Sequence, residues 1–179
     1  MDPEAILDFW FHETNPRYWF RKDQKFDQLI SSRFGALLKQ GCRGELFQWR
    51  DTARGRLAEI LVLDQFSRNI HRGSALAFAA DGMALVLAQE AVAAGLDRQL
   101  EARERSFLYM PYMHSESLAI HRQAVQLFQQ PGLEDNLKFE LKHREILERF
   151  GRYPHRNALL GRVSTPEELA FLQQPGSGF

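Results

Sequence analysis

The sequence predicts an all-α fold, and three observations support this prediction. Apolar residues recur every three or four positions in several segments, as in the run Phe26, Leu29, Ile30, Phe34 and Leu37. No segment alternates apolar and polar residues with the β-branched enrichment that is typical of a strand. Glycine or proline interrupts the periodic pattern roughly every 15–25 residues. We therefore expect stacked antiparallel helix pairs in a single domain over residues 1–179, with residues 173–179 as a flexible tail.

The composition is typical of one globular domain, because 179 residues are enough to bury a sizeable core. The 23 basic and 23 acidic residues give zero formal net charge, which disfavours nucleic acid or an anionic membrane as a partner. Cys42 is the only cysteine, so no internal disulfide can form and a cytoplasmic location is expected. The N-terminus lacks the basic region of a signal peptide, and no window approaches the roughly 18 apolar residues of a transmembrane helix.

Capping residues, glycines and prolines indicate the helix boundaries. Asp2 and Pro3 start a first helix, and Asp23 caps a second one. Pro111 either kinks a helix or opens one that runs to about residue 130. Further helices are expected over residues 56–73, 75–94, 98–109, 133–150 and 154–160, before a terminal helix that starts at the capping box Thr165–Glu168.

The predicted helix over residues 56–73, RLAEILVLDQFSRNIHRG, starts apolar and ends polar. Its polar residues follow one another within nine positions: Asp64, Gln65, Arg68, Asn69 and Arg72. The aspartate and the first arginine are one turn apart, as are the glutamine and the asparagine, so each pair can meet on the helix surface. A core helix that ends in such groups either closes a salt-bridge network or lines a site.

A second polar concentration covers residues 138–162, where seven Lys or Arg residues face three Glu residues. His143 lies in an apolar stripe of this predicted helix. After Gly151 follow the candidates Arg152, His155, Arg156 and Asn157, and then Arg162. A solvated helix end with structural arginine–carboxylate pairs explains this pattern equally well, since such networks imitate functional sites.

The third concentration is MPYMHSE, residues 110–116. His114 and His121 fall on one stripe of the expected helix, about 10 Å apart along its axis, and cannot chelate one metal unaided. A histidine in an apolar stripe is more often a hydrogen-bonded core residue than a ligand. Glu116 completes the candidate residues of this stretch.

No cofactor or metal is expected from the motifs. Glu140 and His143 form one Glu-x-x-His motif without the second copy that a di-metal helical bundle needs. There is no His-Glu-x-x-His and no cysteine cluster, although His114, His143 and His155 can converge in space. Ser115 does not belong to a Gly-x-Ser-x-Gly elbow.

Four stretches resemble a family of uncharacterised bacterial proteins: ILDFWF, RLAEILVLDQFSRNIHRG, FLYMPYMHSE and HREILERFGRYPHRNALLGRVSTPEE. The resemblance covers nearly the whole chain and implies an all-helical, tetratricopeptide-repeat-like fold, without an established reaction or cofactor. Ser67 stands where the family often has proline. The signature maps here onto Asp64, Gln65, Arg68, Asn69, Arg72, His114, Ser115, Glu116, His143, Arg152, His155, Arg156 and Asn157.

These observations favour a cytoplasmic helical protein in which the three polar stretches converge on one pocket. The expected ligand is a small anionic molecule or a carboxylate-bearing peptide end, held by guanidinium groups. In this interpretation, charge is bound by Arg68, Arg72, Arg152 and Arg156, hydrogen bonds come from His114 and His155, and the cations are oriented by Asp64 and Glu116. Arg68 and Arg156 are expected to share one site.

Two alternatives remain open from the sequence. One is an enzyme in which His114 or His155 acts as general acid or base and an arginine stabilises developing negative charge. The other is an interaction scaffold whose concave helical face binds a protein. The alternatives differ in whether the polar stretches line an open concavity or satisfy one another in the interior. The oligomeric state cannot be predicted from these patterns.

Overall fold

The computed structural model describes residues 1–178. The fold is 72% helical, and no strand occurs among the described residues, which confirms the all-α prediction. The α-helices are α1 Pro3–Asp8, α2 Gln24–Cys42, α3 Ala53–Leu61, α4 Ser67–Ile70, α5 Asp81–Ala93, α6 Ala102–His114, α7 Leu118–Phe128, α8 Glu134–Phe150 and α9 Pro166–Leu172. Short 3-10 turns lie at Pro16–Tyr18, Phe47–Asp51, Ala75–Phe78, Leu96–Gln99 and Pro154–Arg156.

The helix predicted over residues 56–73 is a helical run from α3 to α4, widened by a π-turn at Val62–Phe66. All five residues of the π-turn are buried, including Asp64 and Gln65. A π-turn inserts an extra residue into the helix, which turns these polar side chains toward the interior, and such turns are frequent at functional sites. Gly73 follows with φ +79°, in agreement with its predicted role as the stop.

An aromatic cluster fills the core between this helical run and its neighbours. Trp10 is fully buried and packs edge-on against Phe107, with ring centroids 5.6 Å apart. Phe34 stacks on Phe66 at 4.8 Å, and Phe9 contacts both rings. Aromatic side chains bury large apolar areas, so this cluster anchors the π-turn Phe9–Glu13, α2, the π-turn Val62–Phe66 and α6 to one another.

Two predicted helices are shorter than expected. Residues 75–94 split into a 3-10 turn, capped by Ser74, and α5, which starts at Asp81. Of the two roles expected for Pro111, the opening of a helix that runs to about residue 130 is wrong, because Pro111 lies inside α6 and the chain breaks after His114. Extended backbone at residues 115 and 117 separates α6 from α7. His114 and His121 therefore lie on different helices.

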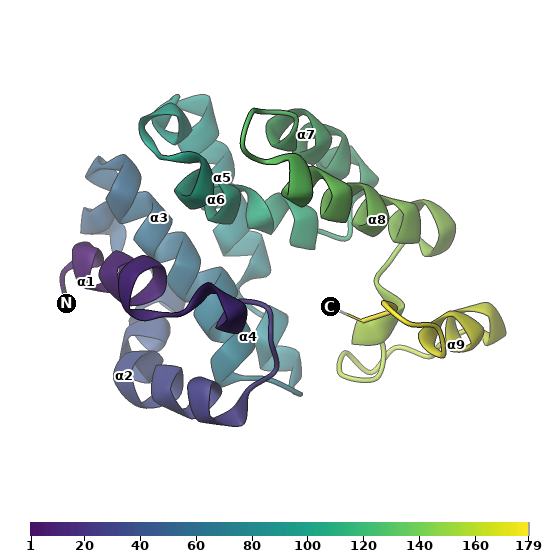
Figure 1. Ribbon diagram of the computed structural model, residues 1–179. Helices are drawn as coiled ribbons and strands as arrows, with labels where there is room; N and C mark the ends of the chain where they lie inside the picture. Colours follow the sequence, from purple (N-terminus) through teal and green to yellow (C-terminus); the bar gives the residue numbers. More distant parts are fainter. Residues whose placement is uncertain (179) are drawn as a thin grey trace.

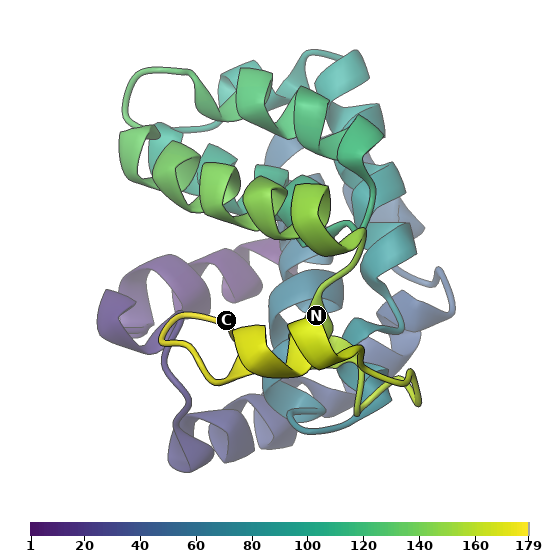
Figure 2. The ribbon, with the colours of Figure 1, turned by 90° about the vertical axis from the view of Figure 1, so that its right-hand side faces the viewer.

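Helices α5 to α8 pack in sequence, each against the next, as Figure 1 shows. After Gly151, with φ +68°, the chain leaves α8 and turns back beneath it toward α9 (Figure 2). Tyr153 fixes this returning segment, because its buried hydroxyl donates to the Met113 carbonyl at 2.6 Å. The return brings residues 153–162 against the C-terminal end of α6.

The capping box Thr165–Glu168 at the start of α9 is confirmed. In the predicted tail, the hydroxyl of Ser177 donates to the Leu172 carbonyl and this serine is buried; residue 179 lies outside the described residues.

One helical stretch, Ala75–Ala93, is long and apolar enough to cross a membrane by length and composition, with a mean hydropathy of 1.5. This differs from the expectation that no window approaches such a length. A third of the window is buried inside the protein, and one such helix is weak evidence for a membrane span.

Candidate functional site

A pocket of about 330 Å³ opens where the start of α5, the end of α6 and the segment after Tyr153 meet. Its walls combine apolar side chains with a few charged ones, which is the usual make-up of a small-molecule site. The lining residues are Ala75, Phe78, Ala79, Asp81, Gly82, Leu85, Pro111, His114, Ser115, Glu116, Arg156 and Leu160.

Asp64 and His114 form a buried pair beside this pocket. Oδ1 of Asp64 lies 2.7 Å from Nδ1 of His114, and Oδ2 accepts from the Gln65 amide at 2.7 Å. Burial alone raises the pKa of Asp64, but Arg68 and His114 outweigh it and hold that pKa well below its usual range. The carboxylate is therefore ionised, and the neutral imidazole carries its proton on Nδ1.

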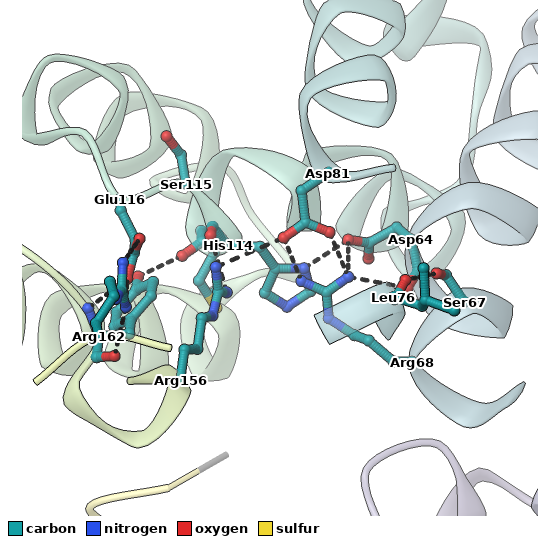
Figure 3. Close-up of polar contacts among 12 residues, drawn as sticks. Asp64, Ser67, Arg68, Leu76, Asp81, His114, Ser115, Glu116, Arg156 and Arg162 are labelled. Carbon is teal, nitrogen blue, oxygen red and sulfur yellow. Dashed lines mark hydrogen bonds and ion pairs between the residues drawn. The ribbon is translucent and has the colours of Figure 1, made fainter. Parts of the chain in front are cut away.

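Asp81 joins the two arginines that were expected to share a site. Arg68 donates to both oxygens of Asp81, at 2.8 and 2.9 Å, and its Nη1 lies 3.0 Å from Oδ1 of Asp64. Nη1 of Arg156 approaches the same Asp81 at 3.6 Å, an ion pair longer than a hydrogen bond. Figure 3 shows Asp81 between the two guanidinium groups.

The Arg156 guanidinium is buried but poorly satisfied. Its side chain is 6% exposed and lies between the rings of Phe78, 4.6 Å away, and Tyr153, 4.7 Å away. Nη2 donates to the His114 carbonyl at 3.0 Å, whereas Nε has no hydrogen-bond partner within residues 1–178. Burial lowers the pKa of Arg156, and the nearby Arg68 lowers it further. A cation in this position benefits from an additional acceptor.

The N-terminus of α5 reaches the same pocket through Asp81 and Gly82. Its N-cap is Ala80, which has no side chain that can accept from the first turn. Backbone N–H groups at an uncapped helix start favour an anion. This start of α5 and Arg156 therefore present hydrogen-bond donors to one space.

Glu116 also lines the pocket, and both of its carboxylate oxygens already accept hydrogen bonds. Arg162 donates to both of its carboxylate oxygens, at 2.7 and 2.8 Å, and the Tyr153 backbone N–H donates to Oε1 at 2.7 Å. The hydrogen bonds from Arg162 lower the pKa of Glu116 against the effect of burial. This pair ties the loop after α6 to the returning segment.

The remaining candidates of the central helix point elsewhere. Asn69 and Arg72 both bind Asp27 of α2, and they line a second pocket of about 530 Å³ near Lys22. The expected Gln65–Asn69 contact is absent from the described residues, because the π-turn changes the register between the two. Gln65 instead contacts the Met110 sulfur at 3.4 Å.

Arg152 and Asn157 belong to a structural network at the start of α9. Arg152 donates to both oxygens of Glu168, at 2.7 and 2.8 Å, and Asn157 donates to the same carboxylate. Hydrogen bonds from Arg152 are the main reason that the pKa of Glu168 falls to about 2. The expectation that Arg152 lines the pocket is wrong, because Glu168 satisfies it.

His143 and His155 lie around the Tyr153 ring, each with its centroid 5.8 Å from that of the tyrosine. Burial lowers the pKa of each histidine to about 3. His121 lies 2.6 Å from Glu140 through Nδ1 and donates through Nε2 to the Ser115 carbonyl at 2.8 Å. No group of three metal-ligating side chains assembles in the described part of the chain.

Sequence reasoning missed three residues that shape the pocket: Asp81, Phe78 and Arg162. Asp81 carried a usable signal, since it is the only acid in the apolar run from residue 75 to residue 88. Phe78 had no comparable signal, and Arg162 stood in the basic stretch over residues 138–162 but was not assigned to the pocket. Their roles depend on how the returning segment packs against α5.

The comparisons place the chain among proteins of the same architecture. A model of the family of bacterial proteins of unknown function DUF924 matches residues 6–176. The chain belongs to the DUF924 family. The chain is similar to a solved structure, that of the protein of unknown function ATU0120 from Agrobacterium tumefaciens. The two sequences are 40% identical, the TM-score is 0.91, and the alignment covers 96% of each chain. No curated protein matches this DUF924 chain closely enough to count as a relative.

Proposed function

We propose that this DUF924 protein binds a small carboxylate-bearing molecule in the pocket between α5, the end of α6 and residues 153–160. The observation that carries the proposal is Arg156. Its buried guanidinium lines the pocket and lies between two aromatic rings, yet its closest carboxylate is 3.6 Å away and is already bound by Arg68. The uncapped start of α5 supplies further donors.

The charge of the cluster favours a monoanion over a multiply charged ligand. Three arginines, Arg68, Arg156 and Arg162, face three carboxylates, Asp64, Asp81 and Glu116, so the formal charges balance while His114 is neutral. A carboxylate adds one negative charge and matches the planar geometry of a guanidinium. The apolar walls suit a short aliphatic body, such as that of a carboxylate-terminated peptide end or a small organic acid.

The proposal is tested by melting the protein with a panel of mono- and dicarboxylates and phosphorylated metabolites. A ligand at about 100 times its dissociation constant adds about 2.7 kcal/mol of stability, which raises the Tm of a domain of this size by several degrees. Arg156→Lys keeps the charge but removes the planar fork, so we expect it to lose the response while remaining folded.

Arg72→Lys is the matched control, because Arg72 binds Asp27 outside the pocket. It should retain the full ligand response. Wild-type protein that no carboxylate stabilises, or an Arg156→Lys variant that responds normally, would rule out the binding function.

We also infer a tetratricopeptide-repeat-like fold and a cytoplasmic location. The sequential packing of α5 to α8 as neighbouring pairs supports a tetratricopeptide-repeat-like superfamily. Cys42 is a free thiol, which supports a cytoplasmic location. Fractionation of the source cells tests the location, and recovery of the protein outside the cytoplasm would contradict it.

A further inference from the structure

The imidazole of His114, which pairs with Asp64, takes no part in the proposed binding of a carboxylate. Asp64 is 1% exposed and fixes the imidazole through Nδ1. No hydrogen bond joins Nε2 of His114 to any described residue, and His114 lines the pocket. An imidazole held by a buried carboxylate on one nitrogen, with the other nitrogen facing a cavity, is the arrangement that general bases use.

The charges around His114 favour its neutral form. Burial lowers the pKa of His114 and Arg68 lowers it further, while Asp64 and Asp81 oppose these effects. His114 is therefore neutral at pH 7. Because Nδ1 donates to the ionised Asp64, the lone pair lies on Nε2 and can accept a proton from a molecule in the pocket.

The pocket lacks a protein nucleophile that His114 can activate. Ser115 lies next to His114 in the chain, but Figure 3 shows its hydroxyl pointing away from the imidazole. The described lining residues include no cysteine, lysine or threonine. The proton that His114 accepts must therefore come from water or from the bound molecule.

We propose that this pocket is a hydrolytic centre in which His114 is the general base for attack of water on a small ester or amide whose carboxylate end is held by Arg156. This inference rests on the proposed binding function and adds to it the substrate class and the reaction.

In the first step, the oxygen of water forms a bond to the carbonyl carbon, and Nε2 of His114 takes the proton that water loses. The tetrahedral intermediate then breaks its bond to the leaving oxygen or nitrogen, which receives the proton back from the imidazolium. One ester or amide and one water give one carboxylic acid and one alcohol or amine, with no change in oxidation state. Asp64 is a positioning residue, since it fixes the imidazole and stabilises the transient imidazolium.

Two ester probes of nearly identical shape test the proposal. Mono(4-nitrophenyl) succinate carries a carboxylate where 4-nitrophenyl butyrate has a methyl group. We expect wild-type protein to hydrolyse the succinate ester with a kcat/KM at least tenfold above that for the butyrate ester. Arg156→Lys should remove this preference by raising KM for the succinate ester only.

His114→Gln should reduce kcat by at least about 100-fold with little change in KM, because general-base catalysis contributes at least this factor. Asp64→Asn should reduce kcat in the same way, again without a matching rise in KM. Arg72→Lys should keep wild-type rates. The rate should fall in acid, as His114 becomes protonated, and the midpoint of the fall should lie below that of an ordinary histidine. The groups that face His114 in this titration are Asp64, Arg68, Asp81, His143 and Arg156.

The outcomes separate the two proposals. If the succinate ester protects the protein against melting through Arg156 but is hydrolysed no faster than in buffer, the hydrolytic inference fails and the binding function stands. The hydrolytic inference also fails, and the binding function stands, if a folded His114→Gln variant has the wild-type kcat. If the ester neither stabilises the protein nor reacts, both proposals fail. Melting curves of each variant show whether it is folded.

Discussion

Arg152 and Arg156 are four residues apart in the chain, and they differ in how many hydrogen bonds and ion pairs their guanidinium groups form. Arg152 meets a carboxylate, Glu168, that it alone binds as an ion pair, and a carbonyl from Val163 completes its contacts. Arg156 meets Asp81 at 3.6 Å, and that carboxylate already accepts two bonds from Arg68. Glu168 satisfies Arg152, whereas Arg156 is left with one long ion pair and with a buried Nε that has no partner within residues 1–178.

The difference shows that residue type and position in the sequence do not reveal which arginine has its donors satisfied inside the protein. What distinguishes the two is the number of acceptor oxygens within reach and the accessibility of the remaining space. Natural proteins often give up stability at functional sites, and this is why the proposed ligand site is placed at Arg156 and not at Arg152. The following predictions test this contrast, from the largest expected effect to the smallest.

Removing the carboxylate of Asp64 should have the largest effect on the free energy of unfolding. Asp64→Ala leaves Arg68 and His114 without the buried acceptor that they share. Breaking a buried ion pair by deleting one partner costs about 3–5 kcal/mol. Urea unfolding should show this loss, and Asp135→Ala, at an exposed pair with Lys138, should be neutral. A loss of unfolding free energy below about 1 kcal/mol would mean that other contacts hold Arg68 and His114 in place.

Acid should destabilise the protein through its buried histidines. The folded-state pKa values of His143 and His155 are about 3, well below the unfolded value near 6.5. Their stabilising effect is complete above pH 6.5, and it is lost as pH falls toward 3, because the unfolded chain takes up protons first. Each contributes a slope of up to about 1.4 kcal/mol per pH unit in this window. Chemical unfolding at pH 7 and pH 5 measures it, and stability that is equal at both values would contradict the assignment.

Replacing each of the two arginines by methionine should change the stability of the protein in different ways. Arg156→Met keeps the chain length in an apolar, aromatic environment and removes a costly buried charge, so we expect stability to stay within about 1 kcal/mol of wild type or to rise. Arg152→Met should lower the Tm by a few degrees, because Glu168 and Asn157 lose their partner. Thermal melts of both variants decide the matter. The opposite order would make Arg156 the structural arginine.

The smallest effect is expected at two helical glycines. An added Cβ meets no atom within 4 Å at Gly35 or at Gly82, so alanine at either position should stabilise its helix by about 0.4–1 kcal/mol. Gly82 also lines the pocket, whereas Gly35 lies in α2. Gly82→Ala should therefore weaken the carboxylate-induced rise in Tm and Gly35→Ala should not. Identical responses in the two variants would place the ligand away from the start of α5.

The sequence by itself determined the helical class and many helix ends. Apolar periodicity and capping residues suffice for this, because helix formation depends on contacts within a few positions of the chain. The capping box Thr165–Glu168 and the stop at Gly151 are examples, and so is the Asp64–Arg68 pair, whose members are one turn apart. The expectation that Arg68 and Arg156 lie in one site also came from local charge, since no acid lies near Arg156 in the chain.

Only the tertiary structure decided which polar residues line the pocket. Arg72 and Arg152 match Arg68 and Arg156 in chemistry, yet distant carboxylates, Asp27 and Glu168, satisfy them. Asp64 is buried in the π-turn, and the side chain of His114, at the end of α6, contacts it. The break after His114 places His121 on a different helix. The physical reason is that a buried charge is fixed by the partner that packing brings within about 3 Å, and that partner can lie anywhere in the chain.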